Sequence, residues 1–431
     1  MRGAFDPELY LRLACERQVL DPGEWHGRGP WLSVPIETAM ALVAIDAIEP
    51  GVAQEILDDY AIALAIRNGS HMPRAFLFRP SQMNRPGRRD LHASRVIACE
   101  QDLEQPWGAL TIHYVSLGET TTSVAITARE SSPGLLISSL GHQGTQQTPI
   151  TDDQGHTEIA NFSGGTGSGG GYHGTLTTTQ PLSKTTKWID INSGRLELPD
   201  GVTAPSVYIE TTTEGDAATR HLWRLVANPN WSRPPPSPLV GGIRRNMGYE
   251  LPRAVDTTIE TLTAAGALAA DAKVIEDARR VMAAWAGQTS PGLPEPWASL
   301  IANRGRLRGP SGVVALGAVT PPVDGTVIAV DALVSSRETF DLRVSASPDL
   351  LQGGTARFVL DGSAIMWWAE DDRRNHYLGT IGDWGSDGSV GTGTVVYTPP
   401  LDPAATELRI LPTGSTERAV ITVALPDWGL R

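Results

Sequence analysis

The chain has 431 residues, of which 40% are hydrophobic and 19% charged, and its net charge is −13. A chain of this length is expected to form about two to four domains with real hydrophobic cores. Its composition is too apolar for a disordered protein and too poor in charge for a coiled coil. The acidic balance makes nucleic acid an unlikely partner and argues against binding to an anionic membrane surface.

Cysteine usage and hydropathy bear on where the protein works. Cys15 and Cys99 are the only cysteines, which excludes a disulfide scaffold and leaves a zinc site without enough thiol ligands. The N-terminal sequence MRGAFDPELYLRLACERQ lacks the apolar stretch of a secretory signal, and no segment reaches the roughly 18–20 apolar residues that span a bilayer. We therefore expect a soluble, cytoplasmic protein. Its basic residues are nearly all Arg, which is typical of a GC-rich bacterial coding sequence.

The first predicted elements are helical. Within residues 1–70, the patterns at Ile36–Glu49 and Val52–Arg67 predict a helical hairpin, because apolar residues recur at helical spacing. Residues 71–95 form an Arg-rich connector between this hairpin and the region that follows.

Residues 96–227 predict a first β region. Short apolar runs alternate with Gly, Pro, Asp and Ser every 8–12 residues, which is typical of an antiparallel sandwich. The last two runs are expected to form a hairpin with its turn at residues 214–216. The predicted strands are RVIAC, LTIHYVSL, SVAITA, GLLISSL, HGTLTTT, KWIDI, RLEL, SVYIET and HLWRLVA.

The same order then recurs. A Pro-rich linker at residues 228–250 favours extended, semi-rigid chain. A second helical hairpin is predicted within residues 251–303, from the patterns at Thr257–Ala269 and Lys273–Ala286. A second β region covers residues 304–431. Its predicted strands are SGVVAL, TVIAVDALV, FDLRVSA, ARFVL, TGTVVYT, ELRIL and AVITVAL.

Dipeptides repeat at one spacing between the two β regions. Residues 152–153 and 371–372 are both Asp-Asp, residues 174–175 and 393–394 are both Gly-Thr, and residues 181–182 and 400–401 are both Pro-Leu, each pair 219 positions apart. Upstream strands match at an offset of 218. This pattern predicts a tandem duplication, because three anchors at one offset and in one order are unlikely to arise by chance.

We therefore predict an α+β fold, mainly β, made of two homologous halves. Each half is a helical hairpin followed by an immunoglobulin-like antiparallel β-sandwich, although a jelly roll or another sandwich stays open because the Cys–Trp–Cys core is absent. The short hairpins must cover their apolar faces with their own sandwich, the other half or a second chain. A pseudo-two-fold arrangement with central hairpins, and a homo-oligomer through them, are both open.

A Gly-rich run and its counterpart are the first candidate binding segments. Residues 164–171 contain the spacing of a dinucleotide fingerprint, but a strand pattern follows where a helix N-terminus would be needed. We expect an inter-strand loop and no cofactor. In the counterpart, Asp371, Asp372, Asp383 and Asp387 offer oxygen ligands, but their order differs from an EF-hand and Asp is a common turn residue. No metal is predicted.

Aromatic and basic clusters supply the remaining candidates. Trp367, Trp368 and Trp384 could stack on a sugar or a partner's apolar side chain, but alternation along a strand places Trp367 and Trp368 on opposite faces, so that at least one belongs to the core. Basic residues cluster at both helix-to-strand junctions and could bind phosphate or an acidic partner, or simply pair with the chain's own acids. The basic candidates are Arg85, Arg88, Arg89, Arg304, Arg306 and Arg308.

No sequence motif nominates a catalytic site. HExxH and the GxSxG elbow are both absent, and the nine His are scattered. The sequence therefore favours a protein-interaction or scaffold protein without enzymatic activity, whose partner is another protein. Two alternatives remain: a small-ligand or carbohydrate-binding module that uses exposed Trp of the second sandwich, and a hydrolase with a site between the halves.

Overall fold

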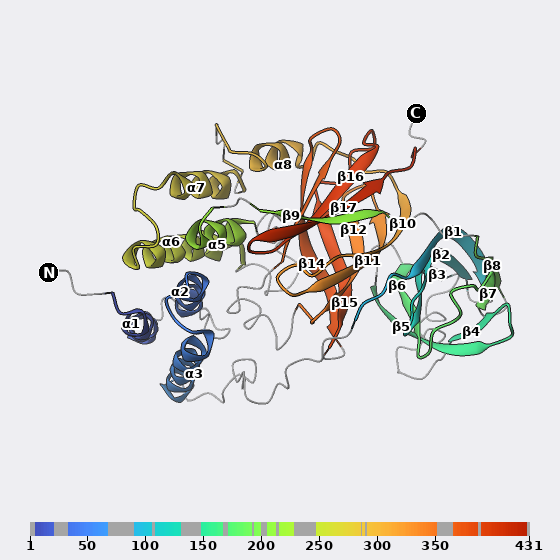
Figure 1. The fold of residues 1–431 in the computed structure, drawn as a ribbon, viewed down its shortest axis with the longest axis horizontal. Coiled ribbons are helices and arrows are strands. Elements are labelled where there is room, and N and C mark those ends of the chain that lie inside the picture. The colour runs from blue at the N-terminus through green and yellow to red at the C-terminus, as the bar shows by residue number, and fades with distance from the viewer. Residues whose placement is uncertain are drawn as a thin grey trace.

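A computed structural model describes residues 5–20, 33–67, 90–105, 108–130, 148–166, 171–191, 194–199, 205–212, 215–227, 247–285, 287–288, 291–350, 365–386 and 389–428. The helices gather at the end of the molecule that carries the N-terminus, one curled sheet lies in the middle and a second lies at the other end (Figure 1). No helix in these ranges is long and apolar enough to cross a membrane. The predicted strands GLLISSL and ARFVL lie outside the described residues.

Helices form two connected groups. They are α1 (Pro7–Leu20), α2 (Ser33–Ala44), α3 (Pro50–Arg67), α5 (Ala217–Val226), α6 (Met247–Ala264), α7 (Lys273–Trp285) and α8 (Trp297–Asn303). The four helices predicted from the sequence are confirmed as α2, α3, α6 and α7. Leu11, Leu42 and Ile56 bury the apolar faces of α1, α2 and α3 against one another. Helix α2 also packs on α6, so helices from the front and rear of the chain meet.

Helix α5 corrects a sequence prediction. HLWRLVA was expected to be the second strand of a hairpin, but it lies in a helix. The Asp216 side chain accepts a hydrogen bond from the Thr219 backbone N–H at 2.8 Å, so this residue caps a helix rather than making a hairpin turn. Ala218, Leu222 and Val226 then bury one helical face at four-residue steps. Over so short a stretch, the apolar pattern fits a strand and a helix equally well.

The first sheet has eight antiparallel strands in the spatial order β1-β2-β3-β6-β5-β4-β7-β8. They are β1 (Arg95–Gln105), β2 (Gly108–Leu117), β3 (Thr122–Glu130), β4 (Thr148–Asp152), β5 (Thr157–Thr166), β6 (Gly171–Thr178), β7 (Trp188–Ile191) and β8 (Gly194–Glu197). The end strands β1 and β8 contact each other, so the sheet curls into a barrel. Alternate residues such as Ile112, Ile126 and Ile150 fill it.

The second sheet has nine strands in the order β10-β11-β12-β15-β14-β13-β16-β17-β9. They are β10 (Gly312–Val319), β11 (Val327–Ser335), β12 (Phe340–Ser347), β13 (Met366–Asp371), β14 (His376–Ser386), β15 (Gly391–Thr398), β16 (Glu407–Thr413), β17 (Glu417–Ala424) and β9 (Ser206–Thr211). The sequence places β9 in the first β region, but it pairs with β17 and completes the second barrel. In its core, Phe340 stacks on Tyr397 and meets Tyr377 edge to face.

The fold is thus α+β and mainly β, with two large barrel-like sheets. The two sheets share one strand order, since β1–β8 and β10–β17 follow the same spatial sequence. Register shifts also recur at the same place, between Ala98 and Gln101 in β1 and between Ala315 and Ala318 in β10. The immunoglobulin-like topology is not confirmed, because the strands of each barrel form one continuous sheet.

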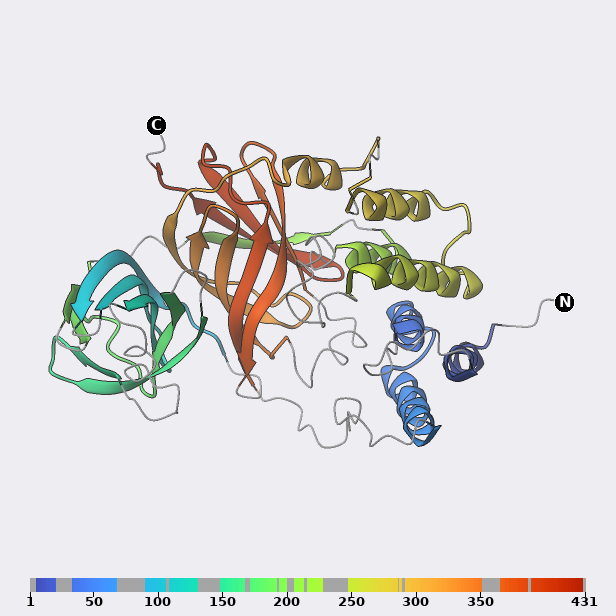
Figure 2. The same ribbon diagram turned by 180° about the vertical axis from the view of Figure 1, so that it is seen from behind.

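The outer faces of β1 and β2 pack on those of β10 and β11, and both ribbon views place the two barrels side by side (Figures 1 and 2). Tyr114 and small residues form this inter-barrel contact. Gly317 has a left-handed φ of 59°, and a Cβ there would lie 2.6 Å from the Ser94 carbonyl oxygen. The Ser116 hydroxyl donates to the Asp331 carboxylate at 3.1 Å across the contact.

Candidate functional site

The predicted tryptophans separate into core and surface roles. Trp367 and Trp368 point to opposite faces of β13, as alternation predicted. Trp367 is 3% exposed and belongs to the core of the second barrel, whereas Trp368 is half-buried and faces the helices. The Trp384 indole N–H donates to Asp349 Oδ1 at 2.8 Å and its ring packs on the barrel core. Trp384 is thus held in the barrel wall.

Of the other candidates, the structure describes only some. Arg85, Arg88, Arg89 and Asp387 lie outside the described residues, as does the side chain of Asp383. Arg304 stacks on the ring of Trp285 and donates from Nη1 to the backbone carbonyl of that residue at 3.2 Å. Arg306 and Arg308 are exposed beyond α8. Among the candidates that the structure describes, Trp368 joins the helices to the second barrel.

Four tryptophans form a cluster between the helices and β13. Trp297 of α8 stacks on Trp223 of α5, with ring centroids 5.6 Å apart. It meets Trp285 of α7 and Trp368 of β13 edge to face, at 6.2 and 5.2 Å. Trp297 is 3% exposed, while Trp223 and Trp368 on either side of it are half-buried. This tryptophan cluster holds the helices against the outer face of the barrel.

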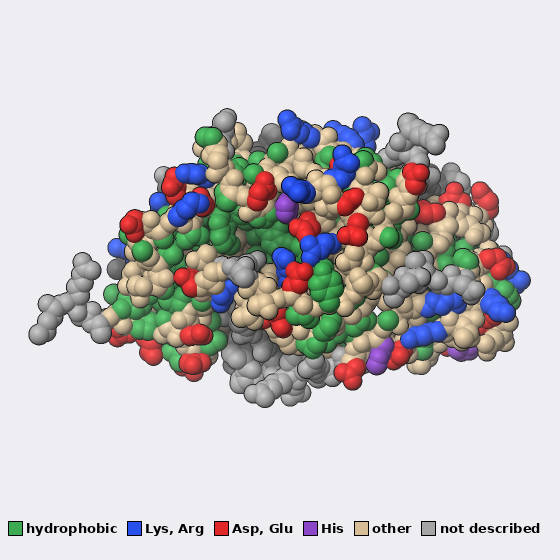
Figure 3. Space-filling model, turned by 45° about the horizontal axis from the view of Figure 1, so that its top comes forward, with side chains coloured by type: hydrophobic (Ala, Val, Ile, Leu, Met, Phe, Trp, Pro, Cys, Tyr) green, Lys and Arg blue, Asp and Glu red, His purple; other side chains and the backbone are tan. Residues whose placement is uncertain are grey.

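The surface is hollowed where the helices meet the second barrel. Figure 3 shows a depression between the helices and the second barrel, with hydrophobic side chains over its floor. Acidic, basic and histidine side chains border it on the barrel side. An apolar floor with polar groups at its edge is the usual arrangement of a ligand site.

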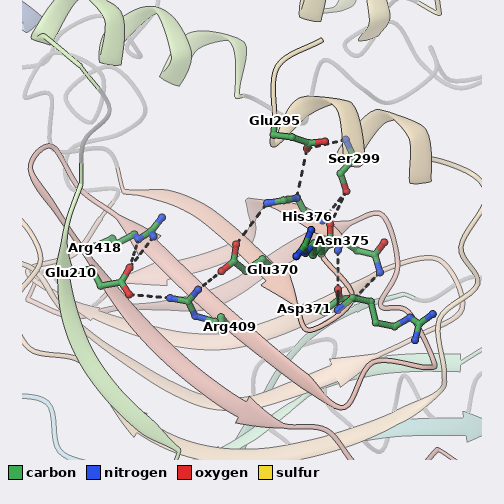
Figure 4. A network of polar contacts seen from close by, with 11 residues as sticks. Glu210, Glu295, Ser299, Glu370, Asp371, Asn375, His376, Arg409 and Arg418 are labelled. Carbon is green, nitrogen blue, oxygen red and sulfur yellow. Dashed lines mark hydrogen bonds and ion pairs between the residues drawn. The ribbon is translucent and has the colours of Figure 1, made fainter. Parts of the chain in front are cut away.

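A row of paired charges crosses the outer face of the barrel (Figure 4). Glu210 of β9 accepts from Nε and Nη2 of Arg418 at 3.0 and 2.8 Å, and from Arg409 of β16 at 3.0 Å. Arg409 also bonds Glu370 of β13, and the Glu370 carboxylate lies 3.7 Å from His376 Nε2. We call these five residues the charge row. Strand register aligns them, since Glu210 faces Arg418, Arg409 faces Glu370 and Glu370 faces His376.

Mutual pairing sets the electrostatics of the charge row. The hydrogen bond from Arg418 lowers the pKa of Glu210 below its ordinary value, so this carboxylate is ionised at neutral pH. Each glutamate of the row has a cationic or imidazole neighbour. The row is therefore rich in planar hydrogen-bonding groups but has little unpaired charge.

The β13–β14 turn fixes His376 in place. Asp371 Oδ1 accepts from the backbone N–H groups of Arg373 and Asn375 at 3.0 and 2.8 Å, and its Oδ2 accepts from Tyr377 Oη at 2.6 Å. Burial, with the Asp371 bond, raises the pKa of Tyr377, which stays protonated as a donor. This turn presents His376 toward α8, and Glu295, which lies just before that helix, is 4.0 Å from Nδ1.

Among the described residues of the site, Ser299 and His376 do not form a catalytic triad. Ser299 Oγ lies near His376, but it accepts from the backbone N–H of that residue at 3.3 Å and donates to the Arg374 carbonyl oxygen at 3.2 Å. Within the described ranges, no group of three or more His, Cys, Asp or Glu could hold a metal ion. Sequence reasoning missed Glu210, Arg409 and Arg418, because only strand pairing brings them together.

Comparisons with known proteins give little guidance. No family model and no curated protein matches the chain. Among solved structures, it is similar to the crystal structure of a conserved domain protein from Bacillus anthracis, at 13% identity over 78% of this chain and 83% of that chain. The TM-score of that match is 0.19, so it carries no argument about fold or function.

Proposed function

We propose that the protein is a binding protein whose ligand occupies the hollow beside the tryptophan cluster and the charge row. The observation that carries this proposal is the meeting of an apolar floor with a row of planar polar groups that neutralise one another. A ligand with an apolar face and a hydroxylated edge, such as a saccharide, fits this chemistry. Its C–H face would pack on indole, and its hydroxyls would bond carboxylate and guanidinium groups.

We also propose that the two barrels arose by tandem duplication, as the sequence repeat suggests. Matching turns support this. Asp152 Oδ1 accepts from the backbone N–H groups of Gln154 and His156, as Asp371 Oδ1 does from residues 373 and 375. The hairpins at Gly118 and Ser336 close with the same backbone bond, to residues 121 and 339.

Comparison of the two copies indicates where the second barrel specialised. At the offset of 219 that the matching turns share, the first barrel has Pro149, Thr151 and Thr157 at the positions of Trp368, Glu370 and His376. Thr151 and Thr157 hydrogen-bond each other at 2.8 Å instead of forming a charge row. The ligand site is thus expected on the second barrel alone.

Titration of tryptophan fluorescence with a panel of neutral mono- and disaccharides tests the proposal. A saturable change is expected for the wild-type protein, with at least about tenfold weaker binding for Trp368→Ala and Glu370→Gln. Trp188→Ala is the matched control, because Trp188 is a half-buried tryptophan of the first barrel with Arg195 stacked on it. Equal loss in the control, or no saturable change with any sugar, would count against a saccharide site.

A protein partner, the first expectation from the sequence, stays a prediction. Purification of the tagged chain from its host, beside the Trp368→Ala variant, would detect it. In one outcome, the wild-type chain recovers a stoichiometric protein that the variant does not, while no saccharide binds. That result would replace the small ligand by a side chain of a protein partner in the same hollow.

A further inference from the structure

A second polar cluster lies on the first barrel, far in sequence from the charge row. The two oxygens of Glu100 both lie 3.3 Å from His113 Nδ1. On the other side of the ring, His113 Nε2 lies 2.6 Å from Thr127 Oγ1. With a proton on Nδ1 facing the carboxylate, Nε2 is the acceptor for the threonine hydroxyl. Carboxylate, imidazole and hydroxyl then stand in the order that activates a hydroxyl for nucleophilic attack.

The backbone at Glu100 is unusual. Its φ is 43°, in the left-handed region that favours glycine, so the backbone at this residue is strained. The β1–β2 register pairs Ala98 with Tyr114, and the β10–β11 register pairs Ala315 with Ala332. These pairs place β1 and β10 at an offset of 217 rather than the 218 predicted from the sequence. The counterpart of Glu100 in the second barrel is therefore Gly317, the residue that such a φ favours.

Because glutamate is strained at this position and the second barrel has glycine there, we infer that the glutamate side chain has a specific role. The glutamate side chain contacts His113. The position of His113 is a bulge in β2, and the corresponding bulge in β11 carries Asp331. The acid–imidazole–hydroxyl arrangement is therefore particular to the first barrel.

We propose that Thr127 is a nucleophile for small acyl groups, with His113 as its general base and Glu100 as the positioning residue. The side chains of Glu100 and His113 are 46% and 26% exposed, so the cluster opens to solvent on that side. Thr127 itself is 5% exposed, which restricts the acyl donor to a small, unhindered ester that approaches past the imidazole. This activity goes beyond ligand binding at the second barrel and is independent of it.

The reaction is a balanced acyl transfer. Thr127 Oγ1 attacks the carbonyl carbon of an ester and its proton passes to His113 Nε2. The bond from the carbonyl carbon to the leaving oxygen then breaks, the alcohol or phenolate leaves, and the imidazolium gives its proton to that leaving group or to water. The product is an ester on Thr127, which water hydrolyses with His113 again as base.

The test uses p-nitrophenyl acetate and the full chain. Release of one equivalent of p-nitrophenolate is expected in a burst, with the acetyl group located on the peptide that contains Thr127 by mass spectrometry. Thr127→Ala must abolish this label and Thr127→Ser must retain it. His113→Gln is expected to slow acetylation by about 10²-fold or more, the usual contribution of a general base.

Two further variants separate a positioning role from a structural one. Glu100→Gln must change the pH profile of acetylation, and Glu100→Gly must slow acetylation while keeping or raising thermal stability, because glycine accepts the left-handed φ. Thr111→Ala is the control, since Thr111 Oγ1 bonds Asp102 without an imidazole. Absence of a label on Thr127 in the wild type, or unchanged rates in His113→Gln and Glu100→Gln, would overturn the proposal.

Discussion

Replacing Asp331 by Asn should stabilise the contact between the two barrels at neutral pH. The Asp331 carboxylate accepts hydrogen bonds from the hydroxyls of Ser116 and Ser94, and burial raises its pKa above the ordinary value. Arg343 of β12 and Tyr114 of β2 face the same region, since both Asp331 and Arg343 act on the pKa of Tyr114.

The sign of the pH dependence follows from this raised pKa. The folded state binds the proton more tightly than the unfolded state, so the free energy of unfolding falls as the pH rises from about 3.9, the unfolded value, through the folded pKa. Asp331→Asn has no proton to lose and removes this part of the slope. We expect a gain of about 1 kcal/mol at pH 7, the low end for a buried polar group, because two hydroxyls already compensate the charge. Below about pH 4, the variant and the wild type should agree.

Urea unfolding at a series of pH values measures this difference. Asp190→Asn is a control of opposite sign, because the hydrogen bond from Arg195 lowers the pKa of Asp190. The contribution of Asp190 to the free energy of unfolding is therefore present above the unfolded pKa and is lost as the pH falls. A lower urea midpoint for Asp331→Asn at pH 7 would refute the reasoning. It would mean that the carboxylate is held as an ion, with Arg343 as its counter-charge.

Three further substitutions test the packing. Gly317→Ala should cost about 2 kcal/mol or more in urea unfolding, because its Cβ would meet the Ser94 carbonyl oxygen and its φ of 59° is left-handed; no loss would contradict the close inter-barrel approach. Tyr377→Phe should cost about 1–2 kcal/mol by removing the bond to Asp371, and a neutral result would show that this bond does not stabilise the turn. Trp297→Ala should cost about 3–5 kcal/mol and raise the protease sensitivity of α5 to α8, unless the helices are held independently of the tryptophan cluster.

Local spacing predicted much of the secondary structure. The apolar patterns of α2, α3, α6 and α7 are long enough to distinguish helical spacing from the alternation of a strand. The opposite orientations of Trp367 and Trp368 follow from strand alternation. The strands β4, β5 and β14 were missed or treated as loops, because Gly, Asp and Asn residues interrupt their apolar pattern. The prediction of a strand at HLWRLVA was wrong. Asp216 can serve as a turn residue or as a helix N-cap, and it acts as the N-cap in the folded protein.

The candidate site was less accessible to sequence reasoning. Trp368 was identified from its aromatic neighbours, but its partners Trp223 and Trp297 come from distant helices. The charge row combines Glu210 from before the helices with Arg409 and Arg418 from near the C-terminus. No local pattern encodes such pairs, since sheet register is decided by the whole barrel. The cluster at Glu100 depends in the same way on a backbone angle that composition does not reveal.

The position of β9 limits how this chain can be divided. Ser206–Thr211 precedes α5 to α8 in sequence yet completes the second barrel by pairing with Glu417–Thr422. A fragment that starts in the Pro-rich linker would leave the outer edge of β17 without its partner strand and Arg418 without Glu210. An exposed strand edge of this kind promotes aggregation. Expression of the rear half alone should therefore begin before residue 206, and a shorter piece is expected to self-associate.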